Sequence, residues 1–190
     1  MTAFIRQAEQ LPVVRQREIV EEFCQLRLSR PEVHQLLPQP LIAFLQRVLE
    51  QWRVDQPALA IPFRWSGLLC GDVSFYEEAV KRAPDDAFSL GQLAQVSLDA
   101  VGYQTHHLCE SSFIGSEGDA FAALGEAAKY ILRMPATEAR QVLQQQISYY
   151  RGLLEAWQRY KSEGDTTGFP DWCRQQDMDF AFSSVVYYNA

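Results

Sequence analysis

The sequence has no long hydrophobic run. None of its apolar stretches approaches the roughly 18 consecutive residues that a membrane-spanning helix needs. Its first residues, MTAFIRQAEQ, include charged and amide side chains where a secretory signal peptide has its apolar region. These two absences predict a soluble, cytoplasmic protein that does not associate with membranes.

Cysteines are few and widely spaced. The four cysteines, Cys24, Cys70, Cys109 and Cys173, lie far apart and form no CxxC pair. Zinc ribbons and small disulfide-linked domains need closely spaced cysteines, so this spacing favours neither class. We expect four reduced thiols, most of them buried, and we expect no cofactor.

Clusters of basic residues are also missing. A protein that binds nucleic acid regardless of its sequence needs grouped lysines and arginines to displace counterions from phosphates, and no such group is present. Gly115 and Gly118 precede a predicted helix, but the lysine of a P-loop does not follow them. The sequence therefore predicts no nucleic-acid partner.

The net charge of −7 is concentrated in one segment. Between Asp72 and Glu126 there are ten acidic residues and two basic ones, a balance of −8, which leaves +1 on the rest of the chain. Opposite charge accelerates association with a partner, so we predict a protein partner with a basic surface. The acidic residues predicted to contact it are Asp72, Glu77, Glu78, Asp85, Asp86, Glu117 and Asp119.

Length and composition favour one folded domain. The chain has 190 residues, of which 47% are hydrophobic and 22% are charged. This composition is far from that of a disordered protein, and the length is sufficient for a sizeable core. We predict a single helical domain that spans residues 1–190.

Apolar residues recur at helical spacing along most of the chain. From Pro40 to Val54 they repeat in steps of three and four, and the longest such stretch starts near Thr137 and ends near Gly164. A last short helix is expected to begin at Pro170. The pattern predicts an all-α fold, a helical bundle built from antiparallel helix pairs.

Two segments lack this helical pattern. Residues 55–72 contain two prolines, two glycines and no sustained period, which is typical of a long connection between elements. The final stretch, DFAFSSVVYYNA, alternates like a strand but has no evident partner strand. We therefore expect an irregular C-terminal tail.

Residues 74–97 resemble, weakly, the junction between two tetratricopeptide repeats. The residues that carry the resemblance are Tyr76, Ala79, Pro84, Leu93 and Ala94. The match covers roughly twenty residues, and one repeat length upstream Pro62 would interrupt the helix that a repeat needs. The resemblance therefore implies one antiparallel helical hairpin, joined at Pro84, whose first helix begins with the capping-box residues Ser74 and Glu77.

The stretch YQTHHLCESSFIGSEGD collects residue types that bind metals. On a helix His106 shares a face with Cys109 and with Glu110, whereas His107 points about 100° away. Zinc usually takes three or four ligands, and the remaining histidine, His34, is far away in the sequence. No nucleophile-elbow or oxyanion-hole signature accompanies these residues. The favoured interpretation is a polar boundary without metal; the alternative is a metal site.

Trp65 is a candidate interface residue. It lies in the proline-interrupted segment, away from the long amphipathic stripes. Aromatic side chains often anchor the centres of interfaces, and a charged rim around them adds specificity. If Trp65 is exposed beside the acidic segment, it would join the partner-binding surface. If it is buried, it would instead close one end of the helical bundle.

These observations favour binding over catalysis. We predict a non-enzymatic protein-binding module, specifically an inhibitor or immunity-type protein that neutralises a basic toxin or enzyme through its acidic central segment. One alternative is a metal-dependent enzyme that uses His106, Cys109 and Glu110. Another is a helical scaffold or homodimer.

Overall fold

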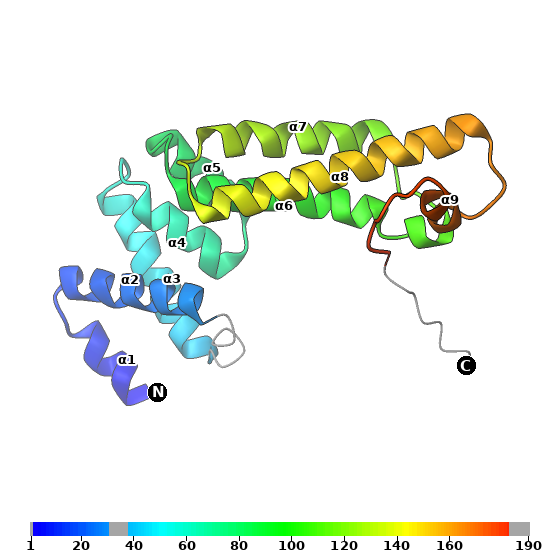
Figure 1. The fold of residues 1–190 in the computed structure, drawn as a ribbon. Coiled ribbons are helices and arrows are strands. Elements are labelled where there is room, and N and C mark those ends of the chain that lie inside the picture. Colours follow the sequence, from blue (N-terminus) through cyan, green and yellow to red (C-terminus); the bar gives the residue numbers. More distant parts are fainter. Residues whose placement is uncertain (1, 31–37, 183–190) are drawn as a thin grey trace, which may run out of the picture. The chain divides into compact units, whose positions relative to one another are not determined.

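The computed structural model describes residues 2–30 and 38–182 (Figure 1). Every regular element within these ranges is a helix, which confirms the predicted all-α class. The chain divides into two compact units, residues 1–89 (unit 1) and residues 90–190 (unit 2). The single domain stays a prediction. His34 and the last eight residues of the predicted tail lie outside the described residues.

Unit 1 is built from five helices within the described ranges. They are α1 (Thr2–Glu9), α2 (Val13–Ser29), α3 (Gln39–Asp55), α4 (Ile61–Cys70) and α5 (Val73–Arg82). Helix α3 supplies most of the core and packs against α1, α2 and α4, while α5 packs on α4. Leu45 and Leu49 on the predicted stripe of α3 are fully buried, as its periodicity requires.

The long connection predicted at residues 55–72 is wrong, because α4 occupies most of it. Pro62 stands in the first turn of this helix, where a backbone N–H needs no intrahelical acceptor. Gly71 ends the helix in the left-handed conformation, with φ of 70°, and donates its N–H to Gly67 O at 2.8 Å. The proline and the glycine therefore mark the two ends of a helix.

Helix α5 begins earlier than its predicted capping box. Asp72 is the N-cap, and its Oδ1 accepts hydrogen bonds from Ser74 N at 3.0 Å and from Ser74 Oγ at 2.7 Å. These bonds lower the pKa of the Asp72 carboxyl, because they stabilise its charged form. Ser74, predicted as the cap, lies inside the first turn instead.

Unit 2 contains the longest helix of the described chain. Its elements are α6 (Ala87–Thr105, which enters the unit at Leu90), the short 3₁₀ turn η2 (Leu108–Glu110), α7 (Glu117–Arg133), α8 (Glu138–Glu163) and α9 (Phe169–Gln175). Helices α7 and α8 run side by side (Figure 1). None of the helices in the described ranges is both long and apolar enough to cross a membrane.

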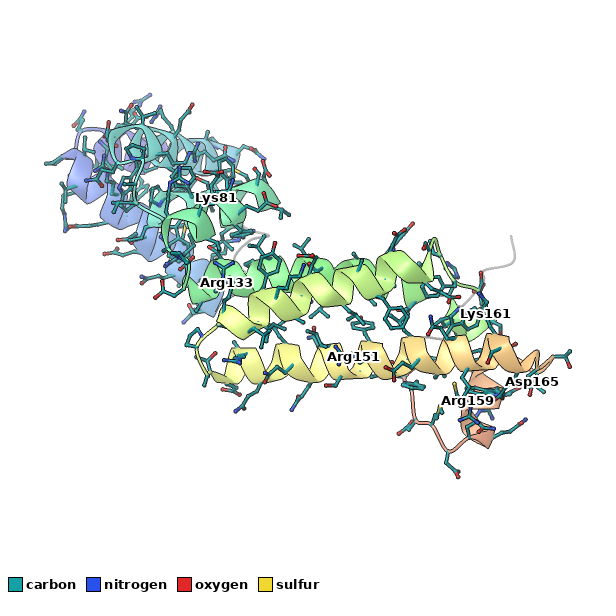
Figure 2. The ribbon with its side chains drawn as sticks, turned by 90° about the horizontal axis from the view of Figure 1, so that it is seen from above. Lys81, Arg133, Arg151, Arg159, Lys161 and Asp165 are labelled. Carbon is teal, nitrogen blue, oxygen red and sulfur yellow. The ribbon has the colours of Figure 1, made fainter. Side chains whose placement is uncertain are left out.

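The predicted bounds of α8 are confirmed by its caps. Thr137 Oγ1 accepts a hydrogen bond from Arg140 N at 3.3 Å, and Gly164 ends the helix with φ of 66°. Figure 2 shows Arg159 and Lys161 near this C-terminal end. Basic side chains near the carbonyl end of a helix interact favourably with its dipole.

Helix α9 is held against α8 by a cluster of aromatic rings. Phe169 contacts Trp157 edge to face, with ring centroids 5.2 Å apart, and stacks with Trp172 at 6.1 Å. All three rings are buried. The helix predicted at Pro170 is thus confirmed.

Helices α5 and α6 follow one another through Pro84, but they belong mainly to different units, so their antiparallel packing stays a prediction.

Gly67 sets the distance between α4 and α5. A Cβ atom at this position would lie 2.6 Å from Cε1 of Tyr76, a buried ring on α5. The absence of a side chain therefore lets the two helices approach closely. By contrast, a Cβ atom at Gly125 on α7 would meet nothing within 4 Å.

We expect Gly67→Ala to destabilise the protein by about 1–3 kcal/mol, because the added methyl group overpacks the contact with Tyr76. Gly125→Ala should stabilise it by about 0.5–1 kcal/mol, since alanine favours a helix and has open space there. Urea unfolding followed by circular dichroism measures both free energies. Equal effects of the two substitutions would contradict the close contact between α4 and α5.

Candidate functional site

The seven acidic residues predicted to bind a partner are divided between the two units. Unit 1 holds Asp72, Glu77, Glu78, Asp85 and Asp86, whereas unit 2 holds Glu117 and Asp119. That these residues form one continuous surface stays a prediction.

Asp86 is a structural residue, which corrects its predicted place on an exposed surface. Its side chain is only 3% exposed and forms a two-pronged ion pair with Arg64, whose Nε donates to Oδ2 at 3.1 Å. Asp86 Oδ2 also accepts a hydrogen bond from Ser89 N at 3.3 Å, in the first turn of α6. A carboxylate with both oxygens occupied inside the fold is not available to a partner.

Glu78 and Glu117 are also bound within the chain. Glu78 accepts from Lys81 Nζ and from Arg82 Nη1, each at 2.6 Å, and these hydrogen bonds lower the pKa of its carboxyl. Glu117 accepts from Lys161 Nζ at 2.6 Å, the main cause of its lowered pKa, and so ties the start of α7 to α8. Of the seven predicted residues, Glu77, Asp85 and Asp119 remain as exposed acids besides the cap Asp72.

Trp65 lies in the core of unit 1 and is only 4% exposed. Its ring centroid is 5.8 Å from that of Phe88, and Arg64 lies over its face at 5.5 Å. The formation of α4 places this side chain among the apolar residues of the core. Its predicted role at the centre of a partner-binding surface is therefore corrected: Trp65 is a packing residue.

The residues predicted as metal ligands do not converge. Helix α6 ends at Thr105, so the helical spacing assumed for His106, Cys109 and Glu110 does not hold. Instead His107 Nδ1 lies 3.3 Å from Glu110 Oε2. Among the described residues, no group of three or more histidine, cysteine or acidic side chains could hold a metal ion.

His106 instead lines a cavity of about 140 Å³ in unit 2. The walls come from the end of α6, the middle of α8 and the segment that follows α9. The lining residues are Gly102, Thr105, His106, Tyr149, Tyr150, Leu153, Ala181 and Phe182. Polar groups and aromatic rings therefore surround this cavity.

A wider, open depression of about 430 Å³ adjoins this cavity. It is lined by Gln95, Val142, Gln145, Gln146, Tyr149 and Tyr150. Tyr149 and Tyr150 line both hollows, so the two lie next to one another, and we call them together the α6–α8 groove.

At Gly102, which lines the cavity, the backbone of α6 lies close to Tyr150 of α8. A Cβ atom there would lie 2.7 Å from the hydroxyl oxygen of Tyr150, so any other residue would push the tyrosine away. Gln95 and Gly102 are spaced seven residues apart, which places them on one stripe of α6, and His106 directly follows the last residue of this helix. Sequence reasoning missed this stripe because it contains no apolar repeat and no recognised motif.

Comparisons of the chain with protein-family models, with curated proteins and with solved structures found no match.

We expect Asp86→Ala to destabilise the protein by about 3 kcal/mol or more, because it leaves the part-buried Arg64 without its partner. The matched control is Glu9→Ala, which removes the exposed pair between Glu9 and Arg47 and should cost less than about 1 kcal/mol. Urea unfolding measures both. A small effect of Asp86→Ala on the free energy of unfolding would contradict the structural role of this residue.

Proposed function

We propose that the protein binds another protein and acts without catalysis, by holding an extended segment of its partner in the α6–α8 groove. The observation that carries this proposal is that two neighbouring hollows share Tyr149 and Tyr150 as lining residues.

The length of the groove suits a short peptide. Gln95 lies on α6, and His106, eleven residues later, directly follows the last residue of this helix. Eleven residues correspond to about 16 Å at the helical rise per residue. An extended chain covers that distance with about five residues. The open hollow would hold the peptide backbone, while the cavity accepts one side chain.

The chemistry of the lining suits a peptide backbone. The carboxamides of Gln145 and Gln146 each contain donors and an acceptor, as an exposed peptide group does. Recognition of extended peptides commonly combines hydrogen bonds to the main chain with pockets for particular side chains. Tyrosines such as Tyr149, which is 37% exposed, are frequent energetic centres of interfaces.

The hydroxyl groups of the cavity do not support catalysis by nucleophilic attack. Thr105 Oγ1 donates to Val101 O at 2.9 Å, and Tyr149 Oη donates to Ala181 O at 3.2 Å. A hydroxyl nucleophile needs a base that takes its proton, and a backbone carbonyl is not such a base. The lining is therefore suited to holding a ligand.

The charge of unit 2 favours a basic partner. This unit contains twelve acidic residues and seven basic ones, a net charge of −5. Such a surplus attracts basic partners and accelerates their association. An inhibitor or immunity-type role against a basic toxin or enzyme stays a prediction from this charge, and a helical scaffold or homodimer stays the alternative.

A selection from a random peptide display library tests the proposal. We expect the wild-type protein to enrich peptides with a shared motif. Val142→Asp should weaken their binding about tenfold or more, because it places a charge among the residues that line the groove. Fluorescence anisotropy with labelled peptides measures the dissociation constants.

Val96→Asp is the matched control. Val96 is 42% exposed on α6 and Val142 is 47% exposed on α8, but only Val142 lines the groove. The control variant should bind the selected peptides as the wild type does. If no peptide is enriched, or if Val142→Asp binds as tightly as Val96→Asp, the groove is not a peptide site.

A further inference from the structure

We infer that the cavity at the His106 end of the α6–α8 groove accepts an arginine side chain of the bound peptide. This inference rests on the proposed function and names the side chain that the groove selects. Three properties of the cavity support it: its polar groups are mainly hydrogen-bond acceptors, an acidic residue lies beside it, and aromatic rings line it.

Two of the three hydroxyl groups of the cavity already donate their hydrogens. Thr105 donates to the carbonyl of Val101, and Tyr149 donates to the carbonyl of Ala181. A hydroxyl group has one hydrogen and two lone pairs, so each of these oxygens can still accept but not donate. A ligand that enters the cavity must therefore bring the donors.

One nitrogen of the His106 imidazole also has a hydrogen-bond partner within the chain. Its Nδ1 lies 2.5 Å from the carbonyl oxygen of Tyr103. A carbonyl oxygen can only accept, so Nδ1 carries the hydrogen, and in the tautomer with its single hydrogen on Nδ1 the Nε2 atom is an acceptor. Tyr150, whose hydroxyl can donate or accept, is the remaining polar side chain of the lining.

Asp99 adds negative charge next to the cavity. It lies on α6, four residues after Gln95 and three residues before Gly102. This spacing places Asp99 on the same stripe of the helix. Gln95 Nε2 donates to Asp99 Oδ1 at 2.8 Å, which holds the carboxylate on this face. Burial and the charge of Asp99 both raise the pKa of Tyr150, which places that charge near the tyrosine hydroxyl.

Basic side chains are absent from the described residues that line the cavity. The basic residue nearest in sequence to its α8 wall is Arg151, which is exposed and points about 100° away from Tyr150 around the helix. Figure 2 shows Arg151 partway along α8. The charge beside the cavity is thus negative, which complements a cation.

The size and walls of the cavity fit a guanidinium group. Its volume of about 140 Å³ is close to that of a cavity that holds one benzene molecule, about 150 Å³. Tyr149, Tyr150 and Phe182 supply aromatic surfaces, on which a planar guanidinium stacks favourably. Arginine also brings five donors for the several acceptors, whereas lysine brings three on a strongly hydrated ammonium.

The test uses acetylated and amidated pentapeptides of the form Ala-Ala-X-Ala-Ala, where X is arginine, citrulline, lysine or leucine. Citrulline has the shape of arginine without its charge. Each peptide is titrated into the ¹⁵N-labelled full-length protein, and the amide shifts of Gly102, Thr105 and Leu153 are followed. The arginine peptide should shift these amides and should bind about fivefold or more tightly than the citrulline peptide.

Two variants separate the local charge from the total charge. Asp99→Asn should weaken binding of the arginine peptide about fivefold, because it removes the carboxylate beside the cavity. Glu126→Gln removes an equal charge from the exposed surface of α7 and should leave binding unchanged.

The outcomes distinguish this inference from the proposed function. Equal binding of the citrulline or leucine peptide, tighter binding of the lysine peptide, or no shift at the three amides would overturn the arginine site. The display selection with Val142→Asp judges peptide binding independently, because it does not presuppose which side chain enters the cavity. A selected motif without arginine would leave the groove as a peptide site and refute its specificity for a guanidinium.

Discussion

The close approach of the α6 backbone to Tyr150 is the contact on which the proposed binding site depends. Because Gly102 has no side chain, the hydroxyl of Tyr150 fits against the helix, and this tyrosine lines both hollows of the groove. Asp99 lies one turn away on the same stripe, so its charge acts on that hydroxyl. A single glycine thus connects the packing of two helices with the electrostatics of the only site proposed for this protein.

The acidic residues of the central segment serve two different purposes. Asp86 and Glu117 hold helices in place, since each accepts from a basic partner distant in the sequence, Arg64 and Lys161 respectively. Asp99 belongs to the same acidic segment, and its sequence context does not distinguish it from these two residues. Its carboxylate nevertheless lies beside a cavity. Part of the charge surplus therefore serves to hold helices together within the chain.

Local signals predicted the helices well where a cap and a periodic stripe agreed. Thr137 and Gly164 bound α8 as expected, because a side-chain cap and a left-handed glycine are properties of a few neighbouring residues. The same logic failed between residues 55 and 72. There Pro62 and Gly71 could mark either a loop or the two ends of a helix, and only the burial of the residues between them favoured the helix.

The sequence by itself determined the helical class, most helix boundaries and the negative charge, because these depend on composition and on contacts within one or two turns. Tertiary structure alone decided that Trp65 is buried, that Glu110 pairs with His107, and that residues of α6 and α8 line the same hollow. Burial and cavity formation depend on which helices meet, and that choice sums many weak contacts between residues distant in the chain.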